Sequence, residues 1–145
     1  MYYEFSVGKE NSLKSAIEIA NAIRSGHITA RKVVEQCLAQ IGQHAEGINA
    51  FVHVDEDGSL AAADDLDSKF AAGEAPGLLA GVPFGVKDLR DTCAGMPTRN
   101  GSLLTKDAPL DELDTPQIAR LRAAGAIPVG KTATAEFGLD GVTHT

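Results

Sequence analysis

Apolar residues recur at three- and four-residue spacing in the first part of the chain. A helix is predicted over residues 12–26, with Leu13, Ile17, Ala20 and Ile23 facing inward. Ser12 can cap its start, and Gly26 fits just past its end. Thr29 can cap a second helix, whose apolar residues are Val34, Leu38 and Ile41. The short link between the two predicts a helical hairpin.

The pattern changes after residue 48. Alternation over residues 49–54 predicts a strand, and a third helix is expected to begin at Ser59. Its inward residues are predicted to be Leu60, Ala63, Leu66 and Phe70. Its acidic residues Asp64, Asp65 and Asp67 are expected to form a solvated face. The flanking Val82, Phe84, Val86 and Leu89 predict that residues 84–89 form a strand buried on both faces.

The second half contains a long segment without periodicity. Glycines and prolines interrupt residues 90–114, and loops of this length are often functional. Within it, Asn100-Gly101-Ser102 is expected to form a turn. Thr115-Pro116 then opens a fourth helix, which Gly125 ends. Residues 126–130 are predicted to be a strand, and Pro128 indicates an edge or a bulge.

This order of elements predicts an α/β fold. An N-terminal helical hairpin, residues 1–45, is followed by part of a mixed β-sheet covered by helices, residues 46–145. The whole chain is expected to be one domain. Only about three strands are predicted where about five would suit this length, so the sheet is expected to be incomplete.

Composition narrows the classes of function. Apolar residues make up 43% of the chain and the net charge is −7, which argues against nucleic acid or an anionic membrane as a direct partner. No apolar run is long enough to span a bilayer, and residues 1–8 do not resemble a signal peptide. Cys37 and Cys93 fit free thiols in a reducing cytoplasm. The four histidines show no ligand spacing, so neither a metal nor a cofactor is predicted.

One segment matches a phosphate-binding motif. Residues 125–132, Gly-Ala-Ile-Pro-Val-Gly-Lys-Thr, satisfy the pattern G-x-x-x-x-G-K-[ST]. A phosphate loop follows a strand and precedes a helix, whereas a predicted helix ends at Gly125. Pro128 also removes one N–H that such a loop uses. A helix end followed by a strand is therefore favoured over nucleotide binding.

Lys87 is the candidate catalytic residue. Most lysines are surface groups, and on composition alone this one would be too. If its apolar strand is buried, desolvation lowers the pKa of the amine and makes it a competent general base. The hydroxyls of Ser102, Thr132 and Thr134 have no visible base beside them, and Glu136 is expected to be structural.

Four motifs in order resemble the amidase signature family of serine amidohydrolases. They are Gly81-Val82-Pro83-Phe84-Gly85-Val86-Lys87-Asp88, Gly95-Met96-Pro97-Thr98 with Gly101-Ser102, Leu121-Arg122-Ala123-Ala124-Gly125-Ala126-Ile127, and Gly130-Lys131-Thr132 with Glu136-Phe137-Gly138. The resemblance covers roughly residues 12–141 and implies an incomplete amidase signature fold.

The resemblance also implies a reaction. Lys87 would be the base of a Ser–cis-Ser–Lys relay that cleaves the C–N bond of a carboxamide. Both serines are expected beyond residue 145, because the 145 residues contain no Gly-Ser-Ser-Gly run. The chain alone is therefore expected to be inactive, and its exposed sheet edges could make it a homo-oligomer. The alternatives are a non-catalytic binding or assembly module and the glutamine-hydrolysing subunit of a tRNA-dependent amidotransferase.

Overall fold

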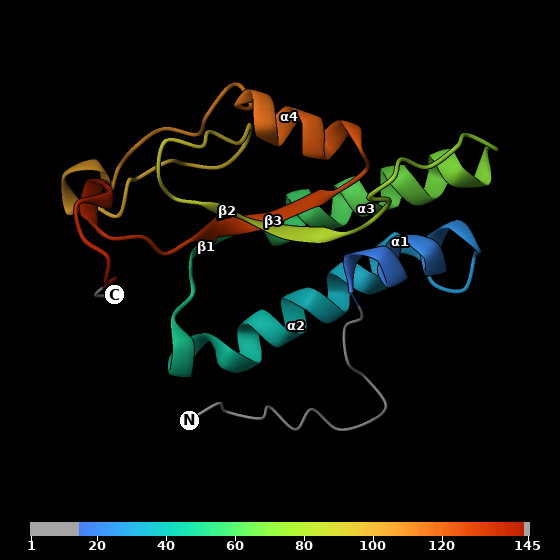
Figure 1. Cartoon of the computed structure of the whole chain (residues 1–145), viewed down its shortest axis with the longest axis horizontal. Helices are drawn as coiled ribbons and strands as arrows, with labels where there is room; N and C mark the ends of the chain where they lie inside the picture. The colour runs from blue at the N-terminus through green and yellow to red at the C-terminus, as the bar shows by residue number, and fades with distance from the viewer. Residues whose placement is uncertain (1–14, 144–145) are drawn as a thin grey trace.

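A three-stranded mixed sheet lies at the centre of the computed structural model, which describes residues 15–143 (Figure 1). The strands are β1 (Phe51–Val54), β2 (Pro83–Lys87) and β3 (Ile127–Thr132), in the order β1-β3-β2. β3 is antiparallel to β1 and parallel to β2. The prediction of about three strands in a mixed sheet is confirmed for the described residues.

Helices cover both faces of this sheet. They are α1 (Ala16–Arg24), α2 (Ala30–Ile48), α3 (Glu56–Ala71) and α4 (Pro116–Ala123). The first three share one hydrophobic cluster with β3, and α4 packs on the other face together with the irregular segment that follows β2 (Figure 1). The α/β class, with a helical hairpin ahead of a helix-covered sheet, is confirmed. None of the helices in residues 15–143 combines the length and apolar character needed to cross a membrane.

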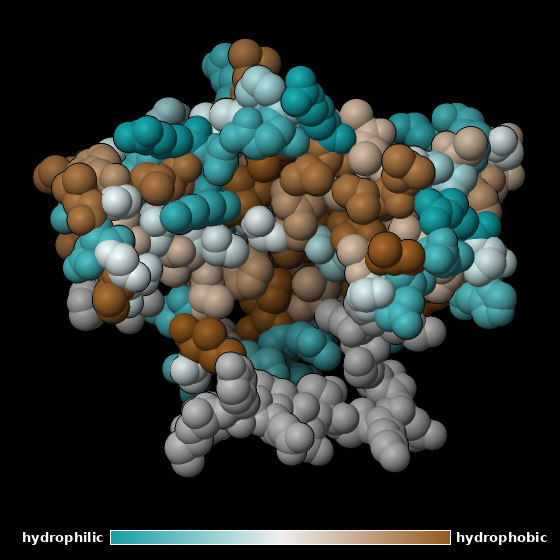
Figure 2. All heavy atoms as spheres, in the orientation of Figure 1, coloured by the Kyte–Doolittle hydropathy of each residue, from teal (hydrophilic) through white to brown (hydrophobic). Residues whose placement is uncertain are grey.

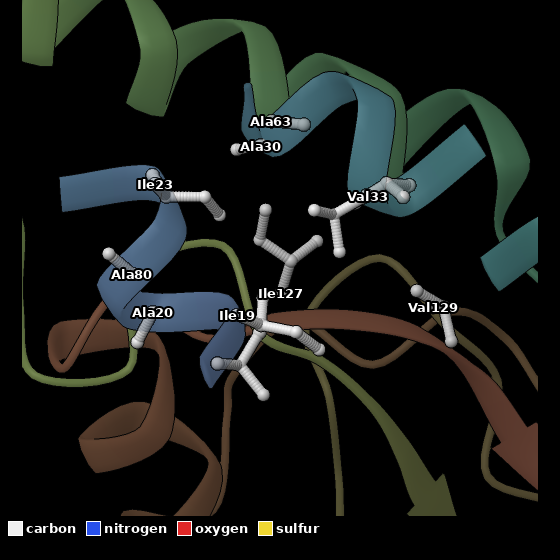
Figure 3. Packing of buried hydrophobic residues seen from close by; sticks show 11 residues of the cluster. Ile19, Ala20, Ile23, Ala30, Val33, Ala63, Ala80, Ile127 and Val129 are labelled. Carbon is white, nitrogen blue, oxygen red and sulfur yellow. The ribbon is translucent and has the colours of Figure 1, made fainter. Parts of the chain in front are cut away.

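The main core lies between the helical layer and β3. Figure 3 shows Ile127 of β3 among side chains of α1 and α2, including Ile23 and Val33. These three residues are 2–3% exposed. Burying side chains of this size contributes about 1.5–3 kcal/mol each to folding. The hairpin is therefore stabilised by the sheet that it covers.

Local capping fixes the helix boundaries. Ser15 and Glu18 form a capping box at the start of α1, and Thr29 accepts the Lys32 N–H at the start of α2. The cap predicted at Ser12 lies outside the described residues. Ile17, expected to face inward, is 72% exposed, because Ile19 shares the buried face of α1 instead.

The start predicted for the third helix was wrong. α3 begins at Glu56 because the Asp55 side chain accepts the Gly58 N–H, so that the cap stands four residues before Ser59. The inward face agrees with the prediction at Leu60, Ala63 and Leu66, which belong to or pack against the main core.

The environment of β3 differs from the expectation of an edge strand. β3 is central, yet its register with β1 begins only at Gly130, so Pro128 faces no β1 residue of that register. On the other side, Pro128 pairs with Phe84, directly before a register shift at Gly85. A bulge was thus correctly indicated, whereas an edge position was not. Proline is tolerated here because no ladder bond to β1 requires its N–H.

Candidate functional site

Lys87 stands at the end of β2, where the two parallel strands finish side by side. Its register partner is Thr132, the last residue of β3, and the Asp88 N–H donates to the Thr132 carbonyl at 3.0 Å. The Lys87 side chain is exposed, and its amine has no hydrogen bond or ion pair with any described residue. The ends of parallel strands are frequent positions for binding and catalytic groups. Lys87 therefore places, at the end of a parallel strand, an amine that has no hydrogen bond or ion pair with the described residues.

Gly85 leaves no side chain next to Lys87 on the same face of β2. A Cβ at Gly85, two residues earlier on β2, would lie 2.6 Å from Cγ2 of Thr132 and 3.4 Å from the ring of Phe51. The first distance is too short for a real contact, so a side chain at this position of β2 would require the Thr132 side chain to move. Side chains two apart on a strand share a face, so Lys87 lies on this same close-packed face.

The predicted burial of Lys87 is wrong in the described residues. The prediction rested on the apolar flanks of a strand expected to be buried on both faces, but among the described residues Gly85 and Lys87 are exposed while Val86 is buried, and β2 is an edge strand paired with β3. Val86 points into the cluster beneath α4, and the alternation of the strand turns Lys87 away from that cluster. Desolvation of the Lys87 amine would need cover from chain outside residues 15–143.

The buried lysine of the sheet is Lys131. It pairs with Val86 in the register, and its side chain is 0% exposed. Its Nζ donates to the Asp91 carbonyl at 2.5 Å and to Thr98 Oγ1 at 2.6 Å, and it lies 3.8 Å from Asp111 Oδ2. These partners satisfy the ammonium group. Lys131 thus anchors the segment after β2 to the sheet.

Sequence reasoning treated Lys131 only as part of a motif. The signal that could have identified its burial is the apolar run Ile127-Pro128-Val129, separated from Lys131 only by Gly130, which is typical of a central strand. This strand also decides the phosphate-loop question. Gly125 follows α4 with φ 91°, and Lys131 and Thr132 lie within β3, so residues 125–132 form a helix end and a strand and not a phosphate cradle.

Asp88, the residue after β2, holds residues 99–101 of the following loop through its carboxylate. Its carboxylate, in a residue only 1% exposed, accepts the N–H groups of Arg99 at 2.7 Å and Gly101 at 3.2 Å. Between them, Asn100 has φ 53° and its Oδ1 accepts the Arg90 N–H. The turn predicted for residues 100–102 is confirmed. A buried carboxylate that accepts backbone N–H groups is a strong positional restraint.

This loop forms one wall of a cavity of about 930 Å³. The cavity is lined by residues of two segments, 99–106 and 134–142, together with Val52 and Asp88. Ser102 Oγ donates to Glu136 Oε1 at 2.6 Å, and the Phe137 N–H donates to the Asn100 carbonyl at 2.8 Å. The bond between Ser102 and Glu136 links the two segments, which agrees with the structural role expected for Glu136. Lys87 does not line this cavity.

Neither cysteine of the chain is set up as a nucleophile. Burial raises the pKa of the Cys37 thiol, and burial also raises the pKa of Cys93, against the opposing effect of Arg122, whose Nη2 donates to Sγ at 3.2 Å. Both cysteines are free. A thiol with a raised pKa is largely protonated and poorly reactive at neutral pH. In residues 15–143, no group of three His, Cys, Asp or Glu residues could hold a metal ion.

Comparison with known proteins identifies relatives over most of the chain. A family model described as Amidase matches residues 32–145. The A-subunit of glutamyl-tRNA(Gln) amidotransferase from Salinispora tropica is 42% identical over 90% of this chain, and that from Rhodopirellula baltica is 41% identical over 92%. The chain spans about a quarter, 26%, of the length of these curated relatives.

Solved structures show the same fold. A bacterial aryl acylamidase of the amidase signature enzymes is 30% identical, with a TM-score of 0.83, and the match covers 90% of this chain and 27% of that chain. A chain of a vestigial protein complex, described for the evolutionary origins of an s-triazine catabolic enzyme, is 37% identical, with a TM-score of 0.81. This second match covers 86% of this chain and 27% of that chain. The sheet and helices seen here therefore correspond to part of a larger fold.

Proposed function

Because this chain belongs to the amidase family, we propose that it is the N-terminal part of an amidohydrolase that cleaves the C–N bond of a linear carboxamide. Lys87 is the base of the proposed Ser–cis-Ser–Lys relay, and both serines come from beyond residue 145. The observation that carries the proposal is the uncommitted, exposed Lys87 amine at the end of an edge strand. Chain from elsewhere can reach both the amine and the free edge of β2.

The proposed relay moves one proton in two steps. The Lys87 amine takes a proton from the middle serine, and that serine takes the proton of the nucleophilic serine as it attacks the amide carbonyl. The C–N bond then breaks, and ammonia or an amine leaves with a proton that returns through the relay. Water hydrolyses the acyl-enzyme and releases the acid. The first step needs a neutral amine. Cover by chain outside the described residues would desolvate the Lys87 amine and so favour its neutral form.

A substitution in the complete natural polypeptide tests the role of Lys87. Lys87→Met keeps the length of the side chain and removes the amine, so amide turnover is expected to fall by at least about a hundredfold, the lower range for a general base. Lys69→Met is the matched control, since it makes the same change at an exposed lysine on α3, away from the strand end. Lys87→Met turnover within twofold of the parent protein would exclude Lys87 as the base.

The 145-residue chain by itself is proposed to be inactive. Amide hydrolysis by this chain that disappears in Lys87→Met would contradict this statement, because it would place a complete site within these residues. The alternative of a non-catalytic assembly module predicts instead that the complete polypeptide has no amidase activity and that Lys87→Met changes nothing measurable. Cytoplasmic location and homo-oligomerisation remain predictions.

One alternative has its own support. The curated relatives at 36–42% identity are A-subunits of glutamyl-tRNA(Gln) amidotransferases, whereas the solved relative at 30% identity is an aryl acylamidase. Ammonia release from glutamine by the complete polypeptide would favour the glutamine-hydrolysing subunit. Release of aniline from acetanilide without release of ammonia from glutamine would favour a general amidase.

A further inference from the structure

Arg99 is a half-buried arginine with no partner for its side chain. Its Nε is buried and has no hydrogen-bond partner, and the guanidinium forms no ion pair with any described residue. Arg122 Nε also lacks a hydrogen bond, but it lies 3.1 Å from Asp114 Oδ2, and its Nη2 donates to the Ala94 carbonyl at 3.1 Å. Buried polar groups in proteins almost always have a partner, so the side chain of Arg99 lacks one that it is built to hold.

The backbone of Arg99 is held rigidly. Its N–H donates to Asp88 Oδ1 at 2.7 Å, and its carbonyl accepts the Ser102 N–H at 3.0 Å and the hydroxyl of Thr105. The adjacent Gly101 has φ 62°, and a Cβ there would lie 2.5 Å from the Thr134 carbonyl oxygen. The loop is therefore closely packed at this point, and it places Arg99 in the lining of the cavity. Preorganisation of this kind reduces the entropy lost on binding.

The other charged side chains that line the cavity have partners among the described residues. Its lining includes two cations, Arg99 and Lys106, and three carboxylates, Asp88, Glu136 and Asp140. The three carboxylates accept backbone or hydroxyl donors within the described chain, and Lys106 lies 3.5 Å from Asp107. Arg99 is thus the one charged residue of this lining whose side chain has no partner among the described residues.

The surroundings select the kind of anion. Three carboxylates around the cavity disfavour a dianion such as phosphate, whereas a monoanion meets less repulsion. The planar fork of a guanidinium matches a carboxylate through two parallel hydrogen bonds. Leu103, Leu139 and Val142 also line the cavity, and they are 57–85% exposed as large apolar side chains without cover. Figure 2 shows hydrophobic side chains gathered at the left end of the molecule, where Figure 1 draws the corresponding segments.

We propose that this cavity is a binding site for a monocarboxylate with an apolar body, held through its carboxylate by Arg99. The hydrocarbon part of the ligand lies against the leucine and valine side chains. The site differs from the Lys87 position, which does not line the cavity. The inference therefore does not need the proposed amidase activity.

Calorimetric titration of the complete natural polypeptide with pentanoate tests the proposal. 2-Hexanone, in which a methyl group replaces the charged oxygen and which has no C–N bond to cleave, is the neutral ligand control, and sodium chloride at equal ionic strength controls for screening. One pentanoate is expected to bind per chain, and 2-hexanone at least about tenfold more weakly, as expected for loss of a charge-assisted hydrogen bond.

Two substitutions assign the contact. Arg99→Gln is expected to weaken pentanoate binding by about 10- to 100-fold and to leave the weak binding of 2-hexanone unchanged. Lys106→Gln removes the other cation of the lining and is expected to weaken pentanoate binding less than about threefold, as for an exposed charge. Circular dichroism of each variant verifies that it is folded.

Three results would overturn the proposal. The first is the absence of saturable pentanoate binding to the parent protein, which would indicate that Arg99 pairs with a carboxylate of the polypeptide itself. The second is equal binding by Arg99→Gln. The third is an equal loss in Lys106→Gln, which would indicate general electrostatic attraction. Because each readout is binding, failure of the amidase proposal would leave this test unaffected.

Discussion

The two lysines at the end of the sheet allow the same substitution to be compared at a buried and an exposed position. Lys131→Met removes the cation from a side chain that is 0% exposed and leaves the Asp111 carboxylate, 3.8 Å away, without its counter-charge. Breaking a buried ion pair from one side costs about 3–5 kcal/mol. Asp111 keeps its bonds from the Cys93 N–H and the Thr98 hydroxyl, so we expect the lower end, about 3 kcal/mol.

Lys87→Met is the control for this experiment, since the exposed Lys87 makes no described hydrogen bond or ion pair. Its effect on the free energy of unfolding is expected to stay within about 0.5 kcal/mol. Urea unfolding followed by far-ultraviolet circular dichroism measures both variants. A loss of about 3 kcal/mol lowers the midpoint by roughly 1 M or more, at slopes of about 1–3 kcal/mol/M. Equal midpoints for the two variants would contradict this expectation, because they would show that the buried lysine contributes nothing net.

Two further predictions concern stability. Asp67 on α3 accepts the N–H groups of Ala30 and Arg31 at the start of α2, one on each carboxylate oxygen. Asp67→Asn replaces one acceptor by an NH2 group and removes the negative charge at a helix N-terminus, so it is expected to lower the free energy of unfolding by about 1–2 kcal/mol. Asp65→Asn is the control, because it removes only an exposed ion pair with Lys69, and its loss in urea unfolding is expected to be no more than about 0.5 kcal/mol. Equal losses for the two variants would argue that Asp67 does not stabilise the start of α2. Desolvation lowers the pKa of His53 in the folded state, so the unfolded chain binds the proton more readily, and stability is lost as the pH falls below about 6.5. Melting temperatures from about pH 7.5 to 5.5 should show a shallower decline for His53→Gln, and parallel profiles would count against this role of the histidine.

Helices could be predicted from the sequence because their determinants are local. The cap at Thr29 and the proline at the first position of α4 act within a few residues of the elements they begin. The start of α3 was missed for the same local reason, since Asp55 and not Ser59 accepts the first free N–H. Capping rules are least reliable where several polar residues near a helix start could each act as the cap.

The carboxylates of α3 were predicted only in part. Asp65 is solvated and pairs with Lys69, as expected for a helix face. Asp67, in contrast, caps a helix that begins 37 residues earlier in the chain. Nothing in the local sequence indicates this contact, because it depends on how α2 and α3 pack together.

Local sequence patterns were enough to predict the α/β class, the helical hairpin and the position of Lys87 near the end of a strand. Periodicity, capping and turn residues act over short distances, so a single chain carries these signals. The burial of Lys131, the exposure of Lys87 and the unpartnered Arg99 at a cavity wall emerged from the folded arrangement. Burial and pairing depend on which strands and loops come to lie beside a residue, and the sheet order β1-β3-β2 brings together segments that are distant in the sequence.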